Sequence, residues 1–337
     1  MKIAASYNSA LDIKKKATEI KAIVQSDIDK IDGFLINNLK SENSLTKDIL
    51  NHVIESGGKR IRPLLSVLSG KVFNHESEEV FYLAAAVELI HSATLLHDDV
   101  IDKSDKRRGL ATVNNKWDNK SAILAGDFIF AKSFELMVKT NNLEVLANLA
   151  KASSVISEGE IAQLELINSN DINLDKYLDV IAAKTARLFA ESCRNSALVA
   201  GVDSEYERLL YDFGLNLGMI FQVIDDVLDY FGDKNLLGKN TGDDFFENKI
   251  TLPVIILNKE LNSKSSELLE LLNKTNKDKK DFQKISTLMS DFGVKTKAID
   301  FVNKYYEQAV NSLLQLPQNQ HTNILKDILE ISLSRIN

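Results

Sequence analysis

Apolar residues recur at helical spacing along most of the chain, with polar residues between them. In chain order this pattern predicts helices over residues 9–40 (one helix or two), 45–56, 63–72, 79–101, 120–139, 142–167, 174–200, 204–231, 284–315 and 321–335. The polar stretch 259–283, rich in Lys, Asn and Ser, predicts a loop or a weak helix. No segment alternates convincingly with period two, so we expect no strand.

The segment 79–101 is apolar on nearly every face, as Phe81, Val87, Leu89 and Ile90 illustrate. A surface helix keeps a polar face, whereas a helix that is apolar all round is buried. We therefore expect this helix in the interior of the fold.

Composition agrees with a helical chain. The 337 residues include 3 Pro and 14 Gly, against roughly 17 and 24 at average usage. Residues that break helices are scarce, so long helices with few connections are expected. The sequence thus predicts an all-α fold in which residues 1–337 form one continuous domain, with residues 1–45 as its N-terminal helices.

Charge and cysteine content narrow the class of protein. The net charge is −7 and the sequence pI is about 5.4, which argues against a nucleic-acid partner because such proteins carry a basic surface. The single cysteine, Cys193, can form neither an intrachain disulfide nor a multi-cysteine zinc site. We see no secretory signal at the N-terminus and no run of about 18 apolar residues that would predict a transmembrane helix. A cytoplasmic location is the expectation.

Two groups of aspartates end the most apolar helices. Their members are Asp98, Asp99 and Asp102 in HDDVID, and Asp225, Asp226 and Asp229 in DDVLD. Residues four apart on a helix share a face, so Asp98 and Asp102 are expected to point the same way. A single group of this kind is as readily a solvated helix end. The recurrence of the spacing on a second apolar helix instead indicates two facing sets of ligands.

Carboxylates crowded beside apolar surface repel one another and lose hydration, which favours a cation between them. Oxygen ligands without a histidine or cysteine partner favour a hard cation. The two acidic groups therefore predict Mg²⁺, with coordination positions left open for phosphate oxygens and water.

Basic residues could supply the other half of an anion site. The segment GGKRIRP, residues 57–63, is a short cationic turn whose glycines allow close approach of the backbone to an anion. Arg107 and Arg108 follow the first acidic group. Taken singly, a basic turn is more often a solvated surface, and arginines beside aspartates can simply form salt bridges.

Further polar residues interrupt or follow the apolar helices. They are His91, Lys184, Thr185, Gln222, Lys239 and Lys249. Gln222 shares a helical face with Asp225, and His91 lies about two turns before Asp98. Any of them could be an ordinary polar residue with a partner, and a satisfied core histidine is the default interpretation of His91.

Together and in order, these motifs carry a family resemblance. They are GGKRIRP, LIHSATLLHDDVIDKSDKRRG, Gly159-Glu160 with Gln163, KTARLF, FQVIDDVLDYFGD and GKNTGDDFFENKITLP. Over about residues 54–253 the chain resembles the trans-isoprenyl diphosphate synthases, and it looks most like their long-chain polyprenyl members. The resemblance implies one large helical bundle of the isoprenoid synthase type with a central apolar cavity.

The resemblance also implies a role for each candidate residue. Mg²⁺ would be held by Asp98, Asp102 and Asp225, with Asp99, Asp226 and Asp229 completing the clusters. The allylic diphosphate would contact Arg107, Lys184, Lys239 and Lys249, and isopentenyl diphosphate would contact Lys59, Arg62, His91 and Arg108. Thr185 and Gln222 would lie against the reacting allylic carbons.

The implied activity is that of a prenyltransferase, in which an allylic diphosphate is extended by repeated addition of isopentenyl diphosphate. The resemblance further implies more than one Mg²⁺ per site, a homodimer, and an octaprenyl-like product of the kind used for quinone side chains. Small residues one turn before the first acidic group, Ala93 and Thr94, would leave a channel open for a long product.

Other functions stay open at this point. A farnesyl or geranylgeranyl diphosphate synthase fits the same motifs, and so does a non-catalytic subunit of a heteromeric synthase, against which the intact acidic groups weigh. A helical metal phosphohydrolase using His97-Asp98 would leave the second acidic group unused, in a chain with five histidines. A terpene cyclase would lack that group and the basic pair Lys59 and Arg62.

Overall fold

The computed structural model describes residues 9–169, 171–232, 241–262 and 265–335, and these are almost entirely helical. The helices are α1 (Ser9–Asn38), α2 (Ser44–Glu55), α3 (Ile61–Val72), α4 (Glu78–Ile101), α5 (Val113–Lys116), α6 (Asn119–Lys139), α7 (Leu143–Ser169), α8 (Leu174–Ile181), η2 (Ala182–Ala186), α9 (Arg187–Ala200), α10 (Ser204–Phe231), α12 (Asp243–Phe246), α13 (Leu252–Leu261), α14 (Ser265–Leu272), α15 (Lys279–Asp291), α16 (Val294–Leu314) and α17 (Gln320–Ser334). The all-α fold class is confirmed.

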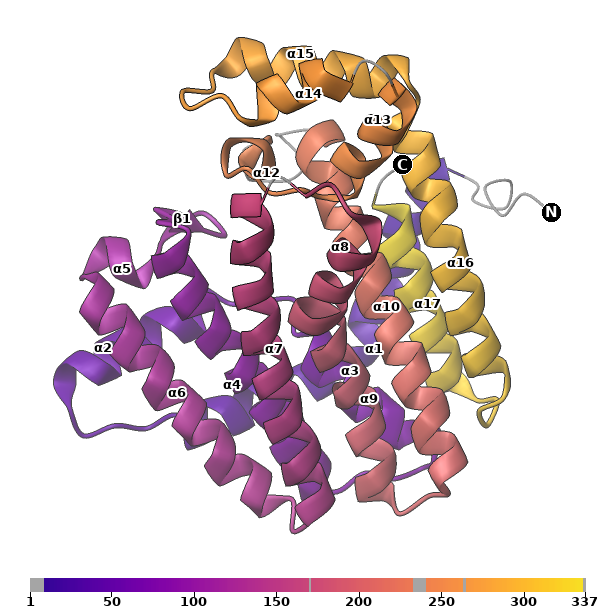
Figure 1. The fold of residues 1–337 in the computed structure, drawn as a ribbon. Coiled ribbons are helices and arrows are strands. Elements are labelled where there is room, and N and C mark those ends of the chain that lie inside the picture. The colour runs from indigo at the N-terminus through magenta and orange to yellow at the C-terminus, as the bar shows by residue number, and fades with distance from the viewer. Residues whose placement is uncertain (1–8, 170, 233–240, 263–264, 336–337) are drawn as a thin grey trace.

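Two helices organise the bundle. α4 packs against α6, α3 and α9, and α10 packs against α9, α16 and α17. α14 and α15 lie across one end of the bundle, above α12 and α13 in Figure 1. The apolar residues of α4 face neighbouring helices on nearly every side: Leu83, Val87 and Ile90 are fully buried. The expectation of an interior helix at 79–101 is therefore confirmed.

The composition of α4 alone would allow it to cross a membrane. It is the one such helix found in the described part of the chain, and 67% of its most apolar window is buried inside the fold. Packing against other helices removes these apolar side chains from water, as lipid would, so α4 is a core helix of this fold.

Close helix contact brings α10 against α9 and η2. A Cβ atom added at Gly214 would lie 2.5 Å from the carbonyl oxygen of Phe189, and one added at Gly218 would lie 2.5 Å from Cα of Ala186. Both distances are well below ordinary van der Waals contact. The two glycines thus let the backbones approach, which places the middle of α10 next to α9 and η2.

A short hairpin corrects the expectation that the chain has no strand. β1 (Lys106–Arg107) pairs antiparallel with β2 (Leu110–Ala111), with Arg107 opposite Leu110. The turn residues Arg108 and Gly109 have positive φ angles of 52° and 83°. Two-residue strands are too short to show alternation, and the left-handed turn at Arg108 is a conformation that sequence pattern does not predict for arginine.

The polar stretch 259–283 is also more regular than expected. It contains the end of α13, all of α14 and the start of α15. The Asp278 side chain accepts hydrogen bonds from the backbone N–H groups of Lys280 and Asp281 and so caps α15. Buried Leu268 and Leu272 anchor α14. Of the two alternatives, a loop or a weak helix, the structure has helices over most of this stretch, stabilised by a few apolar contacts and one cap.

Helix boundaries elsewhere follow the prediction with two interruptions. The single helix expected over residues 174–200 is divided by the π-helical turn η2, and that expected over residues 284–315 is divided at Gly293, whose φ is +64°. The N-terminal segment forms one helix, α1, and is less solvated than expected, because Val24, Ile31 and Leu35 are buried.

Candidate active site

A cavity of about 400 Å³ opens between the C-terminal half of α4, the C-terminal half of α10, and the turn before α3. It brings together most residues that the sequence singled out: Lys59, Arg62, His91, Thr94, Asp98, Arg107, Arg108, Lys184, Thr185, Gln222 and Asp225. Its apolar lining comes from Ile61, Leu95, Phe189 and Phe221. Motifs far apart in the sequence thus meet at one place.

The remaining candidates lie around this cavity or outside the described residues. A smaller space of about 100 Å³ shares Lys184, Thr185 and Gln222 with it and is also lined by Asp226 and Lys249. Ala93 is 2% exposed and belongs to the apolar core between α4 and α6. Lys239 lies outside the described residues.

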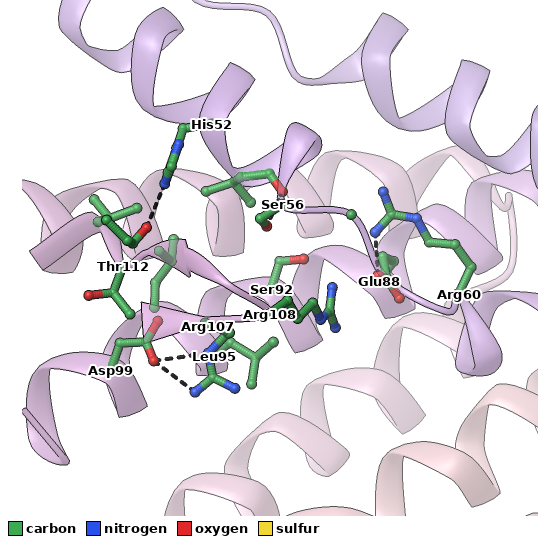
Figure 2. Close-up of a pocket in the computed structure, with 15 residues that line it drawn as sticks. His52, Ser56, Arg60, Glu88, Ser92, Leu95, Asp99, Arg107, Arg108 and Thr112 are labelled. Carbon is green, nitrogen blue, oxygen red and sulfur yellow. Dashed lines mark hydrogen bonds and ion pairs between the residues drawn. The ribbon is translucent and has the colours of Figure 1, made fainter. Parts of the chain in front are cut away.

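The first acidic group divides between two sides of α4. Asp98 lines the large cavity with its carboxylate 3.9 Å from Lys184 Nζ, and Asp102, the C-cap of α4, lies 3.8 Å from Lys249 Nζ. Asp99 is buried and accepts hydrogen bonds from Arg107, one of the interactions drawn as dashed lines in Figure 2. Asp99 therefore holds the hairpin, on a different side of α4 from Asp98.

Burial and mutual repulsion act on the carboxylates of this group. Burial raises the pKa of Asp98; Lys184 opposes this effect, and Asp102 adds to it. Burial would lower the pKa of Lys249, but Asp102 and Glu247 raise it overall. Burial and the neighbouring Asp102 thus disfavour the charged form of Asp98, and the nearby lysine favours it.

The second acidic group also points in more than one direction. Asp225 faces the cavity and pairs with Arg335 at 2.7 Å. Asp226 is buried and accepts hydrogen bonds from the hydroxyl of Tyr177 at 2.6 Å and from the amide of Gln222 at 2.8 Å. Burial raises the pKa of Asp226 to about 7. The carboxylate of Asp229 accepts a hydrogen bond from the backbone N–H of Asp244, which ties α10 to α12.

The two groups thus face the same cavity through Asp98 and Asp225, each already beside a cation. In the described part of the chain, no three histidine, cysteine or acidic side chains converge as a preformed metal site would require.

The π-helical turn η2 places adjacent residues on the cavity wall. Lys184 Nζ lies 2.6 Å from the Glu160 carboxylate and 3.0 Å from the Gln163 side-chain oxygen. The Thr185 hydroxyl donates to Gln222 Oε1 at 2.7 Å. A wide turn inside a helix is a common feature of functional sites, since it turns side chains away from the ordinary helical pattern.

The cationic turn before α3 presents Lys59 and Arg62 to the cavity. Gly57 has a φ of +60°, and Gly58 faces the Arg108 guanidinium so closely that an added Cβ would lie 2.7 Å from Nη1. The Arg62 guanidinium lies 4.3 Å above the Phe189 ring. Burial lowers the pKa of Arg62 to about 10, so that it remains cationic near neutral pH.

His91 lies between these cations and is neutral. Burial lowers its pKa well below the ordinary value, and Arg62 and Arg108 lower it further. It lines the cavity and is thus placed where a bound anion could reach it. A neutral imidazole can donate a hydrogen bond to an anion without adding charge.

Sequence reasoning missed several charged or polar residues at the site. They are Arg60, Glu88, Glu160, Tyr177 and Arg335. Glu88 carried a usable signal, because it is the one charged side chain between Val80 and Leu96 in an otherwise apolar helix. Glu160 belongs to one of the family motifs, but its contact with Lys184 does not follow from that motif. Arg335 follows an unremarkable amphipathic helix, and only the tertiary structure brings it to Asp225.

Comparison with known proteins places this site in a family. The polyprenyl synthetase family model matches residues 43–289. The octaprenyl diphosphate synthase of Haemophilus influenzae is 34% identical over 94% of this chain and 96% of its own length. That of Escherichia coli is 42% identical over 70% of this chain and 73% of its own length.

Solved structures agree with this placement. A polyprenyl synthase from Caulobacter crescentus, complexed with calcium and isoprenyl diphosphate, has a TM-score of 0.88 and 37% identity, with 94% of this chain and 96% of that chain covered. Other relatives are nonaprenyl, heptaprenyl and geranylgeranyl diphosphate synthases, so the family does not fix one product length. The chain belongs to the polyprenyl synthetase family and is a prenyltransferase, a trans-prenyl diphosphate synthase.

Proposed function

We propose that this enzyme makes a long-chain, octaprenyl-like diphosphate by Mg²⁺-dependent, successive condensation of isopentenyl diphosphate with an allylic diphosphate. One observation carries the proposal: two acidic helix ends and two sets of cationic side chains line a single cavity. Such a cavity suits two diphosphates at once, one beside the acidic groups and one beside the cationic turn.

The donor set fits Mg²⁺. Asp98, Asp102 and Asp225 offer only carboxylate oxygens, which hard cations prefer. The absence of a preformed cluster among the described residues fits Mg²⁺ as well, because this ion is usually held by one or two carboxylates together with substrate phosphates and water. When bound, Mg²⁺ would act as a Lewis acid on the leaving diphosphate.

The allylic diphosphate would be held by Arg107, Lys184 and Lys249. Lys184 and Lys249 lie within 4 Å of Asp98 and Asp102 respectively. As the carbon–oxygen bond of the substrate breaks, its electron pair leaves with the diphosphate, and fixed cations stabilise the developing charge. The hydrogen-bonded pair Thr185 and Gln222 lines the same wall and would lie along the allylic carbons.

Isopentenyl diphosphate would be held by Lys59, Arg62 and Arg108, with neutral His91 as a hydrogen-bond donor. Its double bond would attack the allylic cation and form the new carbon–carbon bond. A proton would then pass from the adjacent carbon to an oxygen of the departed diphosphate, which leaves a chain longer by one isoprene unit. The apolar side chains Ile61, Leu95, Phe189 and Phe221 would keep water from capturing the cation.

The proposal of a long product is based on the small residues that precede Asp98 on α4. Thr94 lines the cavity and Ala93 is buried beside it. Helix geometry places them about 6–7.5 Å along α4 from Asp98. Neither side chain is large enough to stop a growing prenyl tail within its first units.

We also propose that the enzyme is a homodimer. Large aliphatic side chains on α6 and at the start of α7 are exposed: Leu124 is 66%, Val138 62% and Leu143 83% exposed. Exposed aliphatic side chains on neighbouring helices are a feature of subunit interfaces. A reducing, cytoplasmic location agrees with a lone buried thiol at Cys193.

The test is the activity of the purified chain alone with Mg²⁺, farnesyl diphosphate and isopentenyl diphosphate. Diphosphate release and long dephosphorylated products are expected, and both should be lost by orders of magnitude in Asp98→Ala and in Asp225→Ala. Near-normal turnover in either variant would contradict the role of its acidic group. An inactive parent that becomes active with a second polypeptide would instead identify a subunit of a heteromeric synthase, and short products would identify a shorter-chain enzyme.

A further inference from the structure

One buried carboxylate lies among the arginines of the cationic turn and the hairpin. Glu88 is 5% exposed and projects from α4. It lines both the large cavity and a smaller one behind the hairpin, which Figure 2 draws with Glu88, Arg60 and Arg108 labelled. Glu88 thus lies between the two cavities and contributes to the lining of each.

Arg60 contacts this carboxylate directly. Its Nη1 donates to Glu88 Oε1 at 2.7 Å, and its Nε donates to Asp32 Oδ1 at 2.8 Å. The backbone of Arg60 is left-handed, with φ +48°, and its side chain is 9% exposed. Arg60 lines the cavity together with Lys59 and Arg62, and its left-handed backbone lets its guanidinium reach both carboxylates.

Arg62 and Arg108 are attracted by the Glu88 carboxylate without a hydrogen bond to it. Glu88 attracts the Arg62 and Arg108 guanidinium groups, and in both it opposes the effect of burial. Arg62 Nε is buried and makes no hydrogen bond with the described residues. His91, which faces the same arginines, is neutral and cannot offset their repulsion. Asp225 also attracts Arg62, and Asp32 attracts Arg60, but among the described groups here Glu88 is the carboxylate that attracts Arg60, Arg62 and Arg108 alike.

We propose that Glu88 is a positioning residue that holds these three arginines together and so shapes the site for the diphosphate of isopentenyl diphosphate. The role rests on the proposed function for the identity of the ligand. Glu88 carries the same sign as the diphosphate, so it acts through the arginines and not by contact. Without it, like charges in a space poor in water would separate and the fixed positions of Arg62 and Arg108 would be lost.

Two opposite effects make the proposal sharply testable. If Glu88 only adds negative charge near the site, Glu88→Gln should tighten the binding of an anion. If it positions the arginines, the same change should weaken binding, even though glutamine keeps an oxygen that can accept from Arg60. Calorimetric titration with inorganic pyrophosphate in the presence of EDTA measures this without metal or turnover. We expect binding roughly tenfold weaker. Unchanged or tighter binding overturns the proposal.

Kinetics supply a second measurement. Glu88→Gln should raise the KM for isopentenyl diphosphate roughly tenfold and change the KM for the allylic substrate less than about twofold. Asp32→Asn is the matched control, because it removes the other carboxylate on Arg60 and leaves Glu88 in place, so both KM values should stay near those of the parent. Equal rises for both substrates in Glu88→Gln would show general disruption and contradict the proposal.

A double variant separates positioning from simple charge balance. Arg60→Met with Glu88→Met removes a buried ion pair as a whole and should fold, since apolar replacement of both partners is usually tolerated. Under the proposal pyrophosphate binding stays weak in this variant, because Arg62 and Arg108 still lack their counter-charge. Full recovery of binding would show that Glu88 serves Arg60 alone. Pyrophosphate binding requires no condensation, so this inference can fail while the activity of the parent stands.

Discussion

Arg335 Nη2 lies 2.7 Å from Asp225 Oδ1, so the end of the last helix closes onto the second acidic group. The guanidinium also lies 4.9 Å above the Phe221 ring, and its Nη1 is buried without a hydrogen bond to the described residues. Burial lowers the pKa of nearby Lys59, and Arg335 lowers it further. Asp225 is thus held by a protein cation at the place where we propose that Mg²⁺ binds.

The first prediction follows from this competition. A metal ion that binds Asp225 must displace Arg335 or share the carboxylate with it. Arg335→Gln should therefore strengthen metal binding in the absence of substrate, by a few fold up to about tenfold, since a charge-assisted contact with Asp225 is removed. Binding of Mn²⁺, as a spectroscopic replacement for Mg²⁺, can be followed by electron paramagnetic resonance.

Lys326→Gln is the control for Arg335→Gln. Lys326 is exposed on the same helix, α17, and its replacement removes the same charge while the pair of Arg335 with Asp225 stays in place. Its Mn²⁺ affinity should match that of the parent. Weaker metal binding in Arg335→Gln than in Lys326→Gln would mean that Arg335 orders Asp225 for the metal and does not compete with it.

The acidic groups illustrate what the sequence can predict. Apolar periodicity located α4 and α10, and the spacing of aspartates at their ends located the cavity, because both signals are local. The direction of each side chain is not local. Asp98 and Asp225 face the cavity, whereas Asp99 and Asp226 are turned to Arg107 and Tyr177.

Partners from distant segments explain the rest of what was missed. Arg335 reaches Asp225 across 110 positions in the sequence, and Lys184 reaches Glu160 across 24. A pattern read along the chain cannot show which helices pack together, and two-residue strands such as β1 leave no periodicity to detect. Long apolar helices and recurring acidic spacings were predictable, while ion pairs between elements were not.

The second prediction concerns the two neighbouring glycines of the cationic turn. A methyl group at Gly58 would lie 2.7 Å from Arg108 Nη1, whereas one at Gly57 would find its nearest neighbour at 3.8 Å but with a φ of +60°. Gly58→Ala should displace Arg108 and raise the KM for isopentenyl diphosphate several-fold with little loss of stability. Gly57→Ala should lower the free energy of unfolding by about 1–2 kcal/mol with a smaller effect on KM.

Steady-state kinetics and urea unfolding of both glycine variants check this crossed pattern. Each variant serves as the control for the other, since each adds one methyl group to the same turn. A KM that rises equally in both would mean that the turn as a whole is disturbed, and that the contact between Gly58 and Arg108 has no specific role.

The third prediction separates the two cationic sets. Arg62→Gln should raise the KM for isopentenyl diphosphate, and Lys184→Gln should raise that for the allylic substrate. Each change removes a charge-assisted contact worth about 1.5–3 kcal/mol, or about 10- to 150-fold in binding. Initial rates with each substrate varied in turn measure both constants. If either variant affects both substrates alike, the assignment of the two sets is wrong.

The fourth prediction tests the channel beside Ala93. Ala93→Tyr should shift the products to farnesyl or geranylgeranyl length while turnover of the primer persists, because the ring would close the space along α4. Without a channel the ring must overpack the core between α4 and α6, at about 1–3 kcal/mol of stability. α6 already lies close to α4, since a Cβ at Gly126 would lie 2.3 Å from His97 Nε2.

Chromatography of the dephosphorylated products and thermal unfolding distinguish these cases. Ala93→Ser adds one atom and should keep the product distribution of the parent. An unchanged distribution in Ala93→Tyr, with or without a lower melting temperature, would show that the tail runs along another face.

The last prediction uses the single thiol of the chain. Cys193 on α9 is fully buried, and burial raises its pKa from 9.0 to about 12. At pH 8 such a thiol carries about a thousandth of the thiolate of an exposed one, and reagent reaches it only when α9 opens. Iodoacetamide should therefore label the native enzyme at least about 100-fold more slowly than the protein unfolded in urea, as measured by mass spectrometry.

The raised pKa of the Cys193 thiol also makes the stability of the fold depend on pH. The unfolded thiol ionises near pH 9 and the native one near pH 12, so the contribution of Cys193 is complete below pH 9 and is lost as the pH rises between these values. Because the chain has one cysteine, the labelling signal has no background, and Cys193→Ala gives the matching pH profile without the thiol. Rapid labelling of the native enzyme would show that α9 opens readily. In that case α9 would not be packed rigidly against α10, and this packing could not fix the position of η2 and Lys184 at the cavity.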